Sequence, residues 1–597
     1  MSSRREKQYN LSFIAKKAIQ NPEQIAKQIK NDVSVNKMSP QEGLALMVSA
    51  DLSKRAYQII RNNGLRLNAN IYPVYNEVRS ARKECYPAGI SVSSSVAEVN
   101  LENLLHHTII RLSQVDSVKK NILNLMPVER GLGVLTCKWG FDGASGQSAY
   151  KQKSKIAGEF FSDSDLFSTT IVPLDLSFGA ESVWKNMRAS STRFCRPIRI
   201  RYVKESVAVL VAEKKSVDDE ISRLAECVLV LVDEKVGEFE LRVKFKLVLS
   251  MIDGKAANAV TGTASTQSCS ICGAKPTQMN QLLIGKTSRL VSNQNNLDYG
   301  ISPLHAWIRC FECVLHVGYR IELKTWQVRG EEAKEKLLAR KKAVQIAFFE
   351  KLGLRVDFPK DSGSGTSNDG NTARRAFREP FIFSEITRVD TELIKRLANI
   401  LWVVNSFRKI NLTTFKEYCL ETYKLFCRLY DWFYMPASVH KLLVHSSEVV
   451  ERFLLPIGMF SEEAQESRNK DNKNFRLKHA RKDSREHTLE DQFNYLLITS
   501  DPLISSLILE KESKKKKNES FEMSAEALAL LDEPVCEVDQ VDESIIEESS
   551  RSDDENDETT SEAEENEQIQ GSSNEKNSFL QMLNSDENRK CELPDYY

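Results

Sequence analysis

Two aspartates followed by glycine lie at the ends of predicted β-strands. Asp142 precedes Gly143, and Asp253 precedes Gly254. In an α/β sheet, ligands collect at such strand ends, and glycine lets a phosphate or metal ion approach the backbone closely. Two such carboxylates can hold a pair of Mg²⁺ ions, which activates an attacking water or 3′-hydroxyl and stabilises the leaving oxygen of a phosphodiester. Asp-Gly is also an ordinary turn signal, so neither pair is diagnostic by itself.

A third acidic candidate opens a predicted helix. Glu462, Glu463 and Glu466 lie in its first turns, and strongly basic residues follow. On helical spacing Glu466, Lys470 and Lys473 share one face. A metal-binding carboxylate followed by cations for phosphate suits a nuclease. A solvated helix with Glu–Lys pairs is the alternative for this segment taken alone.

Two separated pairs of residues have zinc-ligand spacing. Cys269 and Cys272 form a C-x₂-C pair, and His440 and His445 form an H-x₄-H pair. These ligand types match a Cys₂His₂ site, but the long chain between the pairs is unlike a zinc finger. Such a site would join the predicted sheet to a distant helical region. With four ligands and no open position, the ion would be structural.

A second C-x₂-C pair competes for the same ion. Cys310 and Cys313 would complete a four-cysteine site with Cys269 and Cys272. However, they lie within a predicted amphipathic helix, where cysteine is more typically packed as a small hydrophobe. The histidine pair is therefore favoured, and core packing without a metal is an alternative for every one of these pairs.

The elements that must position these residues follow from periodicity. Alternating β-branched and aromatic residues predict strands, and their order with helices predicts an α/β sheet. Ser39 and Glu42 form a helix-capping signature. The predicted strands are 134–139, 168–174, 197–202 and 239–250, with a helix over 221–228, helical spacing over 39–126 and 300–500, and a loop at 361–370.

The chain divides by charge into a basic body and an acidic tail. Residues 532–597 contain 22 Asp and Glu against 4 Lys and Arg, a net charge of −18. The remainder carries 79 Lys and Arg and 61 Asp and Glu, a net charge of +18. This asymmetry is consistent with nucleic-acid contact, and the Ser-rich acidic composition of the tail predicts disorder.

Cysteine usage and hydropathy bound the location. The 12 cysteines are scattered, which argues against a secreted disulfide scaffold and favours a reducing compartment. The start of the sequence has no apolar signal core, and no apolar run approaches the roughly 20 residues of a membrane span. We therefore expect a soluble intracellular protein.

In their order and spacing these motifs resemble the Transib transposases and the related catalytic subunit of the V(D)J recombinase. The resemblance runs from about residue 39 to about residue 490. It is carried by Asp51-Leu52-Ser53-Lys54-Arg55, Ile71-Tyr72-Pro73-Val74-Tyr75, Lys83-Glu84-Cys85-Tyr86-Pro87, Ala97-Glu98-Val99-Asn100-Leu101, Leu104-Leu105-His106-His107-Thr108, Phe141-Asp142-Gly143, Ile252-Asp253-Gly254-Lys255, both zinc-ligand pairs and Glu466-Ser467-Arg468-Asn469-Lys470. The last segment resembles the family's Glu-Ser-x-Asn-Lys helix, which selects Glu466. No RING-type cysteine cluster is seen near the N-terminus, which favours the Transib type over the recombinase subunit, and the resemblance does not extend to the acidic tail.

The resemblance implies an α/β-plus-α organisation around an RNase H-like sheet. The implied regions are a basic DNA-binding segment (1–38), a helical dimerisation and DNA-binding region (39–126), the RNase H-like catalytic core (127–268), a zinc-binding helical insertion (269–457), the catalytic-glutamate helix with further helices (458–510), and a disordered acidic tail (511–597). A large helical insertion would thus precede the third catalytic residue.

The resemblance also implies a DDE-type DNA transposase. Asp142, Asp253 and Glu466 would hold two Mg²⁺ or Mn²⁺ ions, and a structural Zn²⁺ would be bound by the cysteine and histidine pairs. A nuclear homodimer would bind terminal inverted repeats in double-stranded DNA, nick one strand, form a hairpin on the flanking DNA, and join 3′ ends to target DNA. The DNA-binding residues would be Lys54, Arg55, Asn469, Lys470, Lys473 and Arg476. The alternative is a domesticated host DNA-binding protein or recombinase derived from such a transposase.

Overall fold

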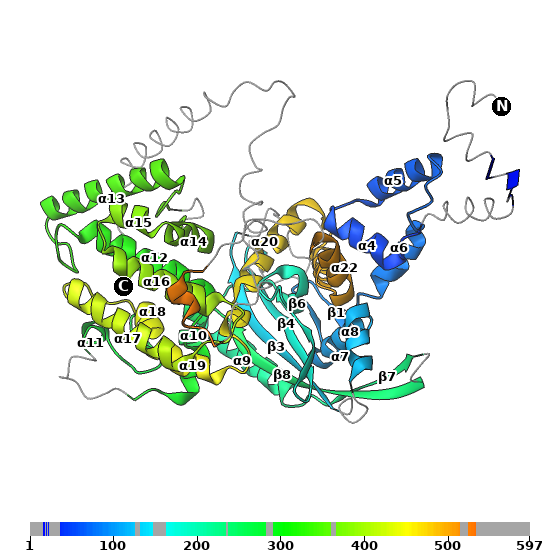
Figure 1. Cartoon of the computed structure of the whole chain (residues 1–597), viewed down its shortest axis with the longest axis horizontal. Helices are drawn as coiled ribbons and strands as arrows, with labels where there is room; N and C mark the ends of the chain where they lie inside the picture. Colours follow the sequence, from blue (N-terminus) through cyan, green and yellow to red (C-terminus); the bar gives the residue numbers. More distant parts are fainter. Residues whose placement is uncertain are drawn as a thin grey trace, which may run out of the picture. The chain divides into compact units, whose positions relative to one another are not determined.

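The chain folds into two units, and Figure 1 labels most of their helices and strands. A computed structural model describes residues 36–125, 132–146, 163–233, 237–281, 291–359, 366–513 and 523–532, with Lys16, Lys17, Ile19, Gln20 and Pro22. One unit comprises Met1–Tyr86 with Asp501–Lys515, and the other Pro87–Ser500 with Lys516–Tyr597. The predicted helical region 39–126 is therefore shared between the units.

The smaller unit is helical. It contains α4 (Pro40–Ser49), α5 (Lys54–Arg66), α6 (Tyr75–Lys83) and α22 (Pro502–Ser513). The predicted cap of α4 is confirmed: the Ser39 N–H donates to Glu42 Oε2 over 2.9 Å, and Ser39 Oγ accepts from the Glu42 N–H over 3.1 Å. The ring of Tyr57 is fully buried, and its hydroxyl donates to Pro73 O. This contact fixes α5 against the segment that leads into α6.

The larger unit is organised around one sheet, which has eight strands in the part of the chain that the structure describes. Their order is β1-β2-β6-β4-β3-β8-β7, with β5 beside β4. Every pair is antiparallel except β3 with β8, which is parallel. The strands are β1 (Ile90–Val92), β2 (Val96–Val99), β3 (Gly133–Ala144), β4 (Leu166–Phe178), β5 (Glu181–Lys185), β6 (Arg196–Arg201), β7 (Cys227–Asp233) and β8 (Gly237–Met251).

Helices cover both faces of this sheet. Successive side chains of a strand point to opposite faces. On β4, Ser168 contacts Gln465 of α20 (Glu463–Lys478), whereas Thr169 donates to Glu213 of α9 (Val207–Ile221) over 2.6 Å. Helices α20 and α9 therefore lie on opposite faces, which explains why β4 is buried along almost its whole length. The remaining helices associated with the sheet are α7 (Leu101–Ser113), α8 (Asp116–Asn124), η2 (Thr192–Phe194), α10 (Gly254–Val260) and α21 (Arg485–Thr499).

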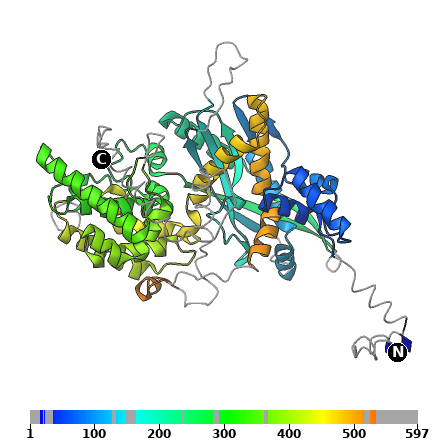
Figure 2. The same cartoon turned by 90° about the horizontal axis from the view of Figure 1, so that it is seen from above.

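A helical region makes up the rest of the larger unit (Figures 1 and 2). Its core is aromatic: the rings of Trp307 and Trp402 lie 4.7 Å apart, and Phe311 packs on Phe348 and Phe383. The elements are α11 (Pro276–Met279), η3 (Gln294–Tyr299), α12 (Pro303–Arg320), α13 (Glu331–Leu352), α14 (Gly370–Arg378), α15 (Pro380–Thr387), α16 (Thr391–Asn405), α17 (Leu412–Leu429), α18 (Ala437–His440), η4 (Lys441–His445), α19 (Ser446–Arg452), η5 (Ile457–Phe460) and α23 (Ala525–Leu528).

The strand predictions are confirmed, but two helical predictions need correction. The four predicted strands correspond to β3, β4, β6 and β8. The predicted helix over 221–228 is wrong: α9 ends at Ile221 and β7 begins at Cys227. The region 39–126 is also not wholly helical, since β1 and β2 extend the sheet through β6. In both cases short apolar runs allow helix or strand, and pairing with a neighbouring strand decides between them.

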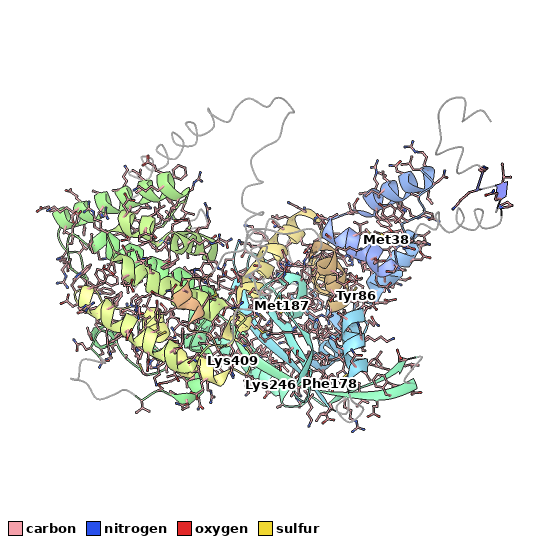
Figure 3. The ribbon with its side chains drawn as sticks, viewed as in Figure 1. Met38, Tyr86, Phe178, Met187, Lys246 and Lys409 are labelled. Atoms are coloured by element: carbon pink, nitrogen blue, oxygen red, sulfur yellow. The ribbon has the colours of Figure 1, made fainter. Side chains whose placement is uncertain are left out.

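The predicted disorder from residue 511 onward also needs correction. Helix α22 continues to Ser513, and residues 523–532 fold onto the helical region. The N–H of Asn411 donates to Leu530 O, and the N–H of Asp532 donates to the carbonyl of Lys409, which is labelled in Figure 3. Leu530 is 4% exposed. Backbone hydrogen bonds and the burial of apolar side chains hold residues 523–532 against the helical region, although the sequence that follows is acidic. Residues 514–522 and 533–597 lie outside the described residues, as do residues 360–365 of the predicted loop.

Helix α20 is attached to the sheet face by buried polar side chains. Arg476 is 2% exposed and binds Asp163 through the backbone carbonyl and the carboxylate, each at 2.6 Å. Arg468 is fully buried and donates to the Cys195 carbonyl over 2.9 Å. Buried charges need such partners because their desolvation is costly.

We expect Arg476→Leu to lower the free energy of unfolding by about 3–5 kcal/mol, because it leaves the Asp163 carboxylate buried without its cation. Lys473→Leu is the matched control, since Lys473 is exposed on the same helix, and surface substitutions usually change stability by less than about 0.5 kcal/mol. Chemical denaturation of both variants measures the difference. Equal midpoints for the two variants would contradict a structural role for the Arg476–Asp163 pair.

Candidate functional site

Asp142 lies on β3, and Asp253 lies just beyond the end of β8, the parallel neighbour of β3. Gly140 of β3 aligns with Met251 of β8, and each aspartate lies two residues beyond that pair. A Cβ atom on Gly140 would lie 1.9 Å from the Met251 carbonyl oxygen. Glycine is therefore required for β3 and β8 to approach closely here. The parallel register brings the two aspartates to the same end of the sheet.

Asp253 has a local structural partner as well. It is the N-cap of α10, and its Oδ1 accepts from the Ala256 N–H over 2.7 Å. This bond fixes one carboxylate oxygen at the helix N-terminus.

Asp142 interacts electrostatically with every other predicted member of the acidic site. Burial raises the pKa of Asp142 well above its ordinary value, and the negative charges of Asp253, Glu466 and Glu205 raise it further. The cation of His305 acts in the opposite direction. Charges must be close to influence one another in this way. Side chains from β3, from the N-terminus of α10 and from α20 thus influence one another, although Asp142 and Glu466 are more than 300 residues apart in the sequence.

Glu466 keeps an open side chain in this cluster. Its side chain is 46% exposed, and Oε1 lies 3.5 Å from Nε2 of His305. The surrounding protein nevertheless desolvates the carboxylate and raises its pKa, His305 lowers it, and Glu462 and Glu463 raise it. A partly open carboxylate beside two aspartates suits a metal ligand.

The neighbouring glutamates of α20 are engaged by the helical region. Glu462 is 3% exposed and lies 2.6 Å from Nδ1 of His305. Glu463 forms an ion pair with Arg374 of α14 over 2.8 Å. Glu466 is therefore the least committed of the three acids, and its selection as the third metal ligand stays a prediction.

Asn469 of α20 forms a hydrogen bond to the first aspartate. Its Nδ2 donates to Asp142 Oδ2 over 2.6 Å, and its Oδ1 accepts from Ser168 Oγ over 3.2 Å. The amide thus binds the first aspartate through one N–H and Ser168 through its oxygen, and its contact with DNA stays a prediction.

The predicted basic contacts divide by exposure. Lys470 and Lys473 are exposed on α20, and Lys54 and Arg55 are exposed on α5 of the smaller unit. Their DNA contacts stay predictions. Arg476 needs correction, because burial and the Asp163 pair leave its guanidinium no surface to offer to a phosphate. Helical charge patterns alone do not distinguish a buried arginine from an exposed one.

Two further residues join the acidic cluster without having been predicted. The side chain of Glu205 occupies the space beside Gly143, where a Cβ atom would lie 2.7 Å from Glu205 Cβ. Lys255 Nζ lies 2.8 Å from Glu205 Oε1, and its raised pKa arises from Glu205, then Asp253 and Asp142. From the sequence, a phosphate or metal ion is expected to approach Gly143, but the side chain of Glu205 fills that space. Gly143 itself was the one sign in the sequence that another group lies close here.

A buried lysine, Lys138, holds the start of α20. It is fully buried in β3, and its Nζ donates to the Ser461 carbonyl over 2.5 Å. Burial lowers the pKa of Lys138 from 10.5 to about 8, although Cys195, Glu462 and Glu463 act in the opposite direction. The sequence analysis places Lys138 only within a strand. A lysine in the middle of an apolar strand was the signal for a buried anchor.

The predicted zinc ligands come together completely. The Sγ atoms of Cys269 and Cys272 and the ring nitrogens of His440 and His445 all lie within 4.8 Å of one another. Elsewhere in the described part of the chain, no set of three or more His, Cys, Asp or Glu side chains brings its ligand atoms together in this way. The ligand oxygens of Asp142, Asp253 and Glu466 therefore do not converge on one point, and the carboxylates of Asp142 and Asp253 each accept an N–H hydrogen bond.

The two cysteines are presented by a tight turn. The Gly273 N–H donates to the Cys269 carbonyl over 2.8 Å, and the Cys269 N–H donates to the Ala274 carbonyl over 2.9 Å. Gly273 has φ +71°, a conformation that glycine adopts without strain. The Cys272 thiol also donates to Cys269 and lowers its pKa. Two buried cysteines whose Sγ atoms lie within 4.8 Å of each other are suited to a soft metal cation.

The two histidines meet because the helix between them widens. In an α-helix, residues five apart point roughly 140° away from one another. The chain over Lys441–His445 is instead a π-helix, whose i→i+5 repeat returns His445 to the side of His440. Their ring centroids lie 5.2 Å apart. Short π-helical segments are rare in proteins, and those that occur are often found at functional sites. This segment therefore supports a ligand role for the two histidines.

The donors fit a tetrahedral metal ion such as zinc. All four side chains are buried, Cys272 Sγ lies 3.5 Å from His440 Nε2, and His445 Nε2 is buried with no hydrogen-bond partner within the structure. The competing Cys310 and Cys313 lie in α12 and pack in the apolar core of the helical region. The geometry therefore favours the Cys₂His₂ set over the four-cysteine set.

Comparison with known proteins adds little. No family model matches the chain, and no curated protein matches it. The Drosophila P element transposase strand transfer complex is a similar solved structure, with 11% identity, a TM-score of 0.25, and coverage of 83% of this chain and 98% of that chain. A TM-score this low does not establish a shared fold, so a function must be argued from the side chains. Among the described helices, none combines the length and apolar composition needed to cross a bilayer.

We expect His440→Ala to lose one bound zinc and to reduce stability, because metal binding and folding are coupled in such sites. Cys313→Ala should retain the zinc, since Cys313 packs only as a small core residue. Metal analysis of the purified wild type and both variants measures this. Zinc kept by His440→Ala but lost by Cys313→Ala would establish the four-cysteine site instead.

We also expect the loss of stability caused by Lys138→Met to increase with pH. Between about 8 and 10.5 an unfolded lysine binds more protons than the folded Lys138 does, so rising pH stabilises the wild type relative to the variant. Denaturation midpoints of both proteins at about pH 7.5 and about pH 9.5 measure the change, with Lys185→Met, at an exposed position, as control. A difference that shrinks as pH rises would show that Lys138 is not a desolvated cation.

Proposed function

We propose that the chain is a metal-dependent DNA transposase of the DDE type. The observation that carries the proposal is the acidic cluster: Asp142 lies on β3, Asp253 lies just beyond the end of the adjacent parallel strand β8, and Glu466 reaches the same place from α20. Three acids from distant segments with partly open side chains are difficult to explain by stability, because like charges repel. They suit the binding of divalent cations.

The proposal includes an RNase H-like core. Strands β6, β4 and β3 form an antiparallel meander, and β8 adds in parallel on the other side of β3 after α9. This order supports an RNase H-like arrangement, in which the first and fourth core strands carry the two aspartates. Strands β1 and β2 extend one edge and β7 the other. The helical region between α11 and α19 would correspond to the helical insertion expected before Glu466.

The protein groups around the acids divide the work. When bound, two Mg²⁺ or Mn²⁺ ions would activate the attacking water or 3′-hydroxyl and stabilise the leaving oxygen. Asp142, Asp253 and Glu466 would be their ligands. Asn469 orients Asp142, and Lys255 balances the charge of Glu205. The exposed Lys470 and Lys473 follow Glu466 along α20 and would contact DNA phosphates.

The remaining partners follow from the resemblance and the charge of the body. The net charge of +18 outside the acidic tail supports binding to double-stranded DNA. We propose terminal inverted repeats as its specific sites, with nicking, hairpin formation and joining of 3′ ends. We further expect a homodimer in the nucleus, with Lys54 and Arg55 of the smaller unit among its DNA contacts.

The zinc centre would act indirectly. Its histidines precede Glu466 by 26 and 21 residues, and its cysteines follow α10, whose N-cap is Asp253. A structural Zn²⁺ there would close the long helical excursion and return the chain to the sheet. Since four protein ligands leave no open position, the ion would not act on substrate.

We expect Glu466→Gln, Asp142→Asn and Asp253→Asn each to abolish nicking and hairpin formation on terminal-repeat DNA with Mn²⁺. DNA affinity should be largely kept, because it comes from lysine and arginine contacts to phosphate. Glu463→Gln is the matched control on α20, because an amide can keep a hydrogen bond to Arg374. Gel assays of cleavage and binding on the same preparations measure both. If Glu466→Gln still forms hairpins and Glu463→Gln does not, the third metal ligand is Glu463, one helical turn before Glu466.

A further inference from the structure

A histidine from the helical region lies against the third acid of the cluster. His305 is in the first turn of α12, 161 residues before Glu466 in the sequence. Its Nε2 lies 3.5 Å from Glu466 Oε1. Its side chain is 20% exposed, whereas that of Glu466 is 46% exposed. The histidine is thus packed behind a carboxylate that remains open on its other side.

The other ring nitrogen of His305 is fixed by buried partners. Nδ1 lies 2.6 Å from Glu462 Oε1 and 2.9 Å from Ser302 Oγ. Ser302 is the N-cap of α12, and its Oγ accepts from the His305 N–H over 3.1 Å and also bonds to Glu462. Ser302, Glu462 and the helix start therefore determine the ring orientation, which directs Nε2 at Glu466.

The orienting carboxylate is itself held in place. Glu462 is 3% exposed and directly follows Ser461, whose carbonyl accepts from the buried Lys138. On its other side, Glu463 pairs with Arg374 of α14. The start of α20 is thus held by the sheet and by two helices of the helical region. A ring fastened to this segment moves with Glu466.

We propose that His305 is a positioning residue for Glu466, supplied to the acidic cluster by the helical region. This inference rests on the proposed function, in which Glu466 is a ligand of the divalent ions. Hydrogen bonds to a ligating carboxylate orient it, and the loss of such an outer partner typically costs about 10–100-fold in metal affinity or activity. Because His305 belongs to α12, the metal site depends on the position of α12 as well as on the sheet and α20.

Two substitutions separate the two ring nitrogens. In His305→Gln the amide nitrogen lies near the place of Nε2 and can still reach Glu466. In His305→Asn the shorter side chain reaches only the side of Glu462 and Ser302. A positioning role for Nε2 therefore predicts that the glutamine variant outperforms the asparagine variant, whereas a role in packing alone predicts no such order.

The test is Mn²⁺ binding to the full-length, zinc-loaded protein, measured by calorimetry without DNA. We expect His305→Asn to weaken Mn²⁺ binding at least about tenfold and to raise the Mn²⁺ concentration needed for half-maximal nicking by a similar factor. His305→Gln should bind Mn²⁺ more tightly than His305→Asn. Arg309→Gln, at a position with 55% side-chain exposure on the same helix, is the control and should match the wild type.

The outcomes distinguish this inference from the proposed function. Wild-type Mn²⁺ affinity in His305→Asn, with loss of binding in Asp142→Asn, would overturn the role of His305 alone. Unchanged Mn²⁺ binding in Asp142→Asn would instead overturn the acidic metal site. If thermal melting shows that His305→Asn is unfolded, Glu462→Gln replaces it, since it releases the ring from the other side; wild-type Mn²⁺ affinity in that folded variant overturns the inference.

Discussion

Helix α20 is bound to the sheet through hydrogen-bonded polar side chains rather than an apolar stripe. Five side chains each form a hydrogen bond to a specific partner across this contact: Lys138, Gln465, Arg468, Asn469 and Arg476. An apolar contact tolerates small rotations, but a buried polar group that loses its partner incurs a large desolvation cost. A shift of α20 by one residue would break all of these bonds at once. The position of Glu466 beside the two aspartates depends on that constraint.

The helical region completes the same constraint from the other side. The π-helix at Lys441–His445 brings two histidines to the cysteine turn that follows α10. Soon after it, the chain reaches the start of α20, where α12 and α14 hold Glu462 and Glu463. A long excursion thus returns to the sheet at two fixed places. Without them, the entropy of a long loop would oppose the assembly of three distant acids.

The sequence predicts best where a pattern is local. Strands β3, β4, β6 and β8 follow from β-branched and aromatic runs, and the cap of α4 follows from Ser39 and Glu42. It fails where neighbours decide. Cys227 begins a strand because β8 pairs with it, although its surroundings allow a helix. Arg476 is buried although charge spacing places it among surface cations.

By itself, the sequence determined which residue types could do chemistry and in what order: two Asp-Gly pairs, a glutamate at the head of a basic helix, and one cysteine and one histidine pair. Its resemblance to the family's Glu-Ser-x-Asn-Lys helix also predicts Glu466 as the third acid. Only the tertiary structure decided which side chains meet, because these contacts join segments that sequence periodicity cannot relate. It turned Asn469 inward to Asp142, placed Glu205 in the space left by Gly143, and brought His305 to Glu466. The physical reason is that burial, hydrogen bonding and charge act between neighbours in space, whereas a linear pattern records only neighbours along the chain.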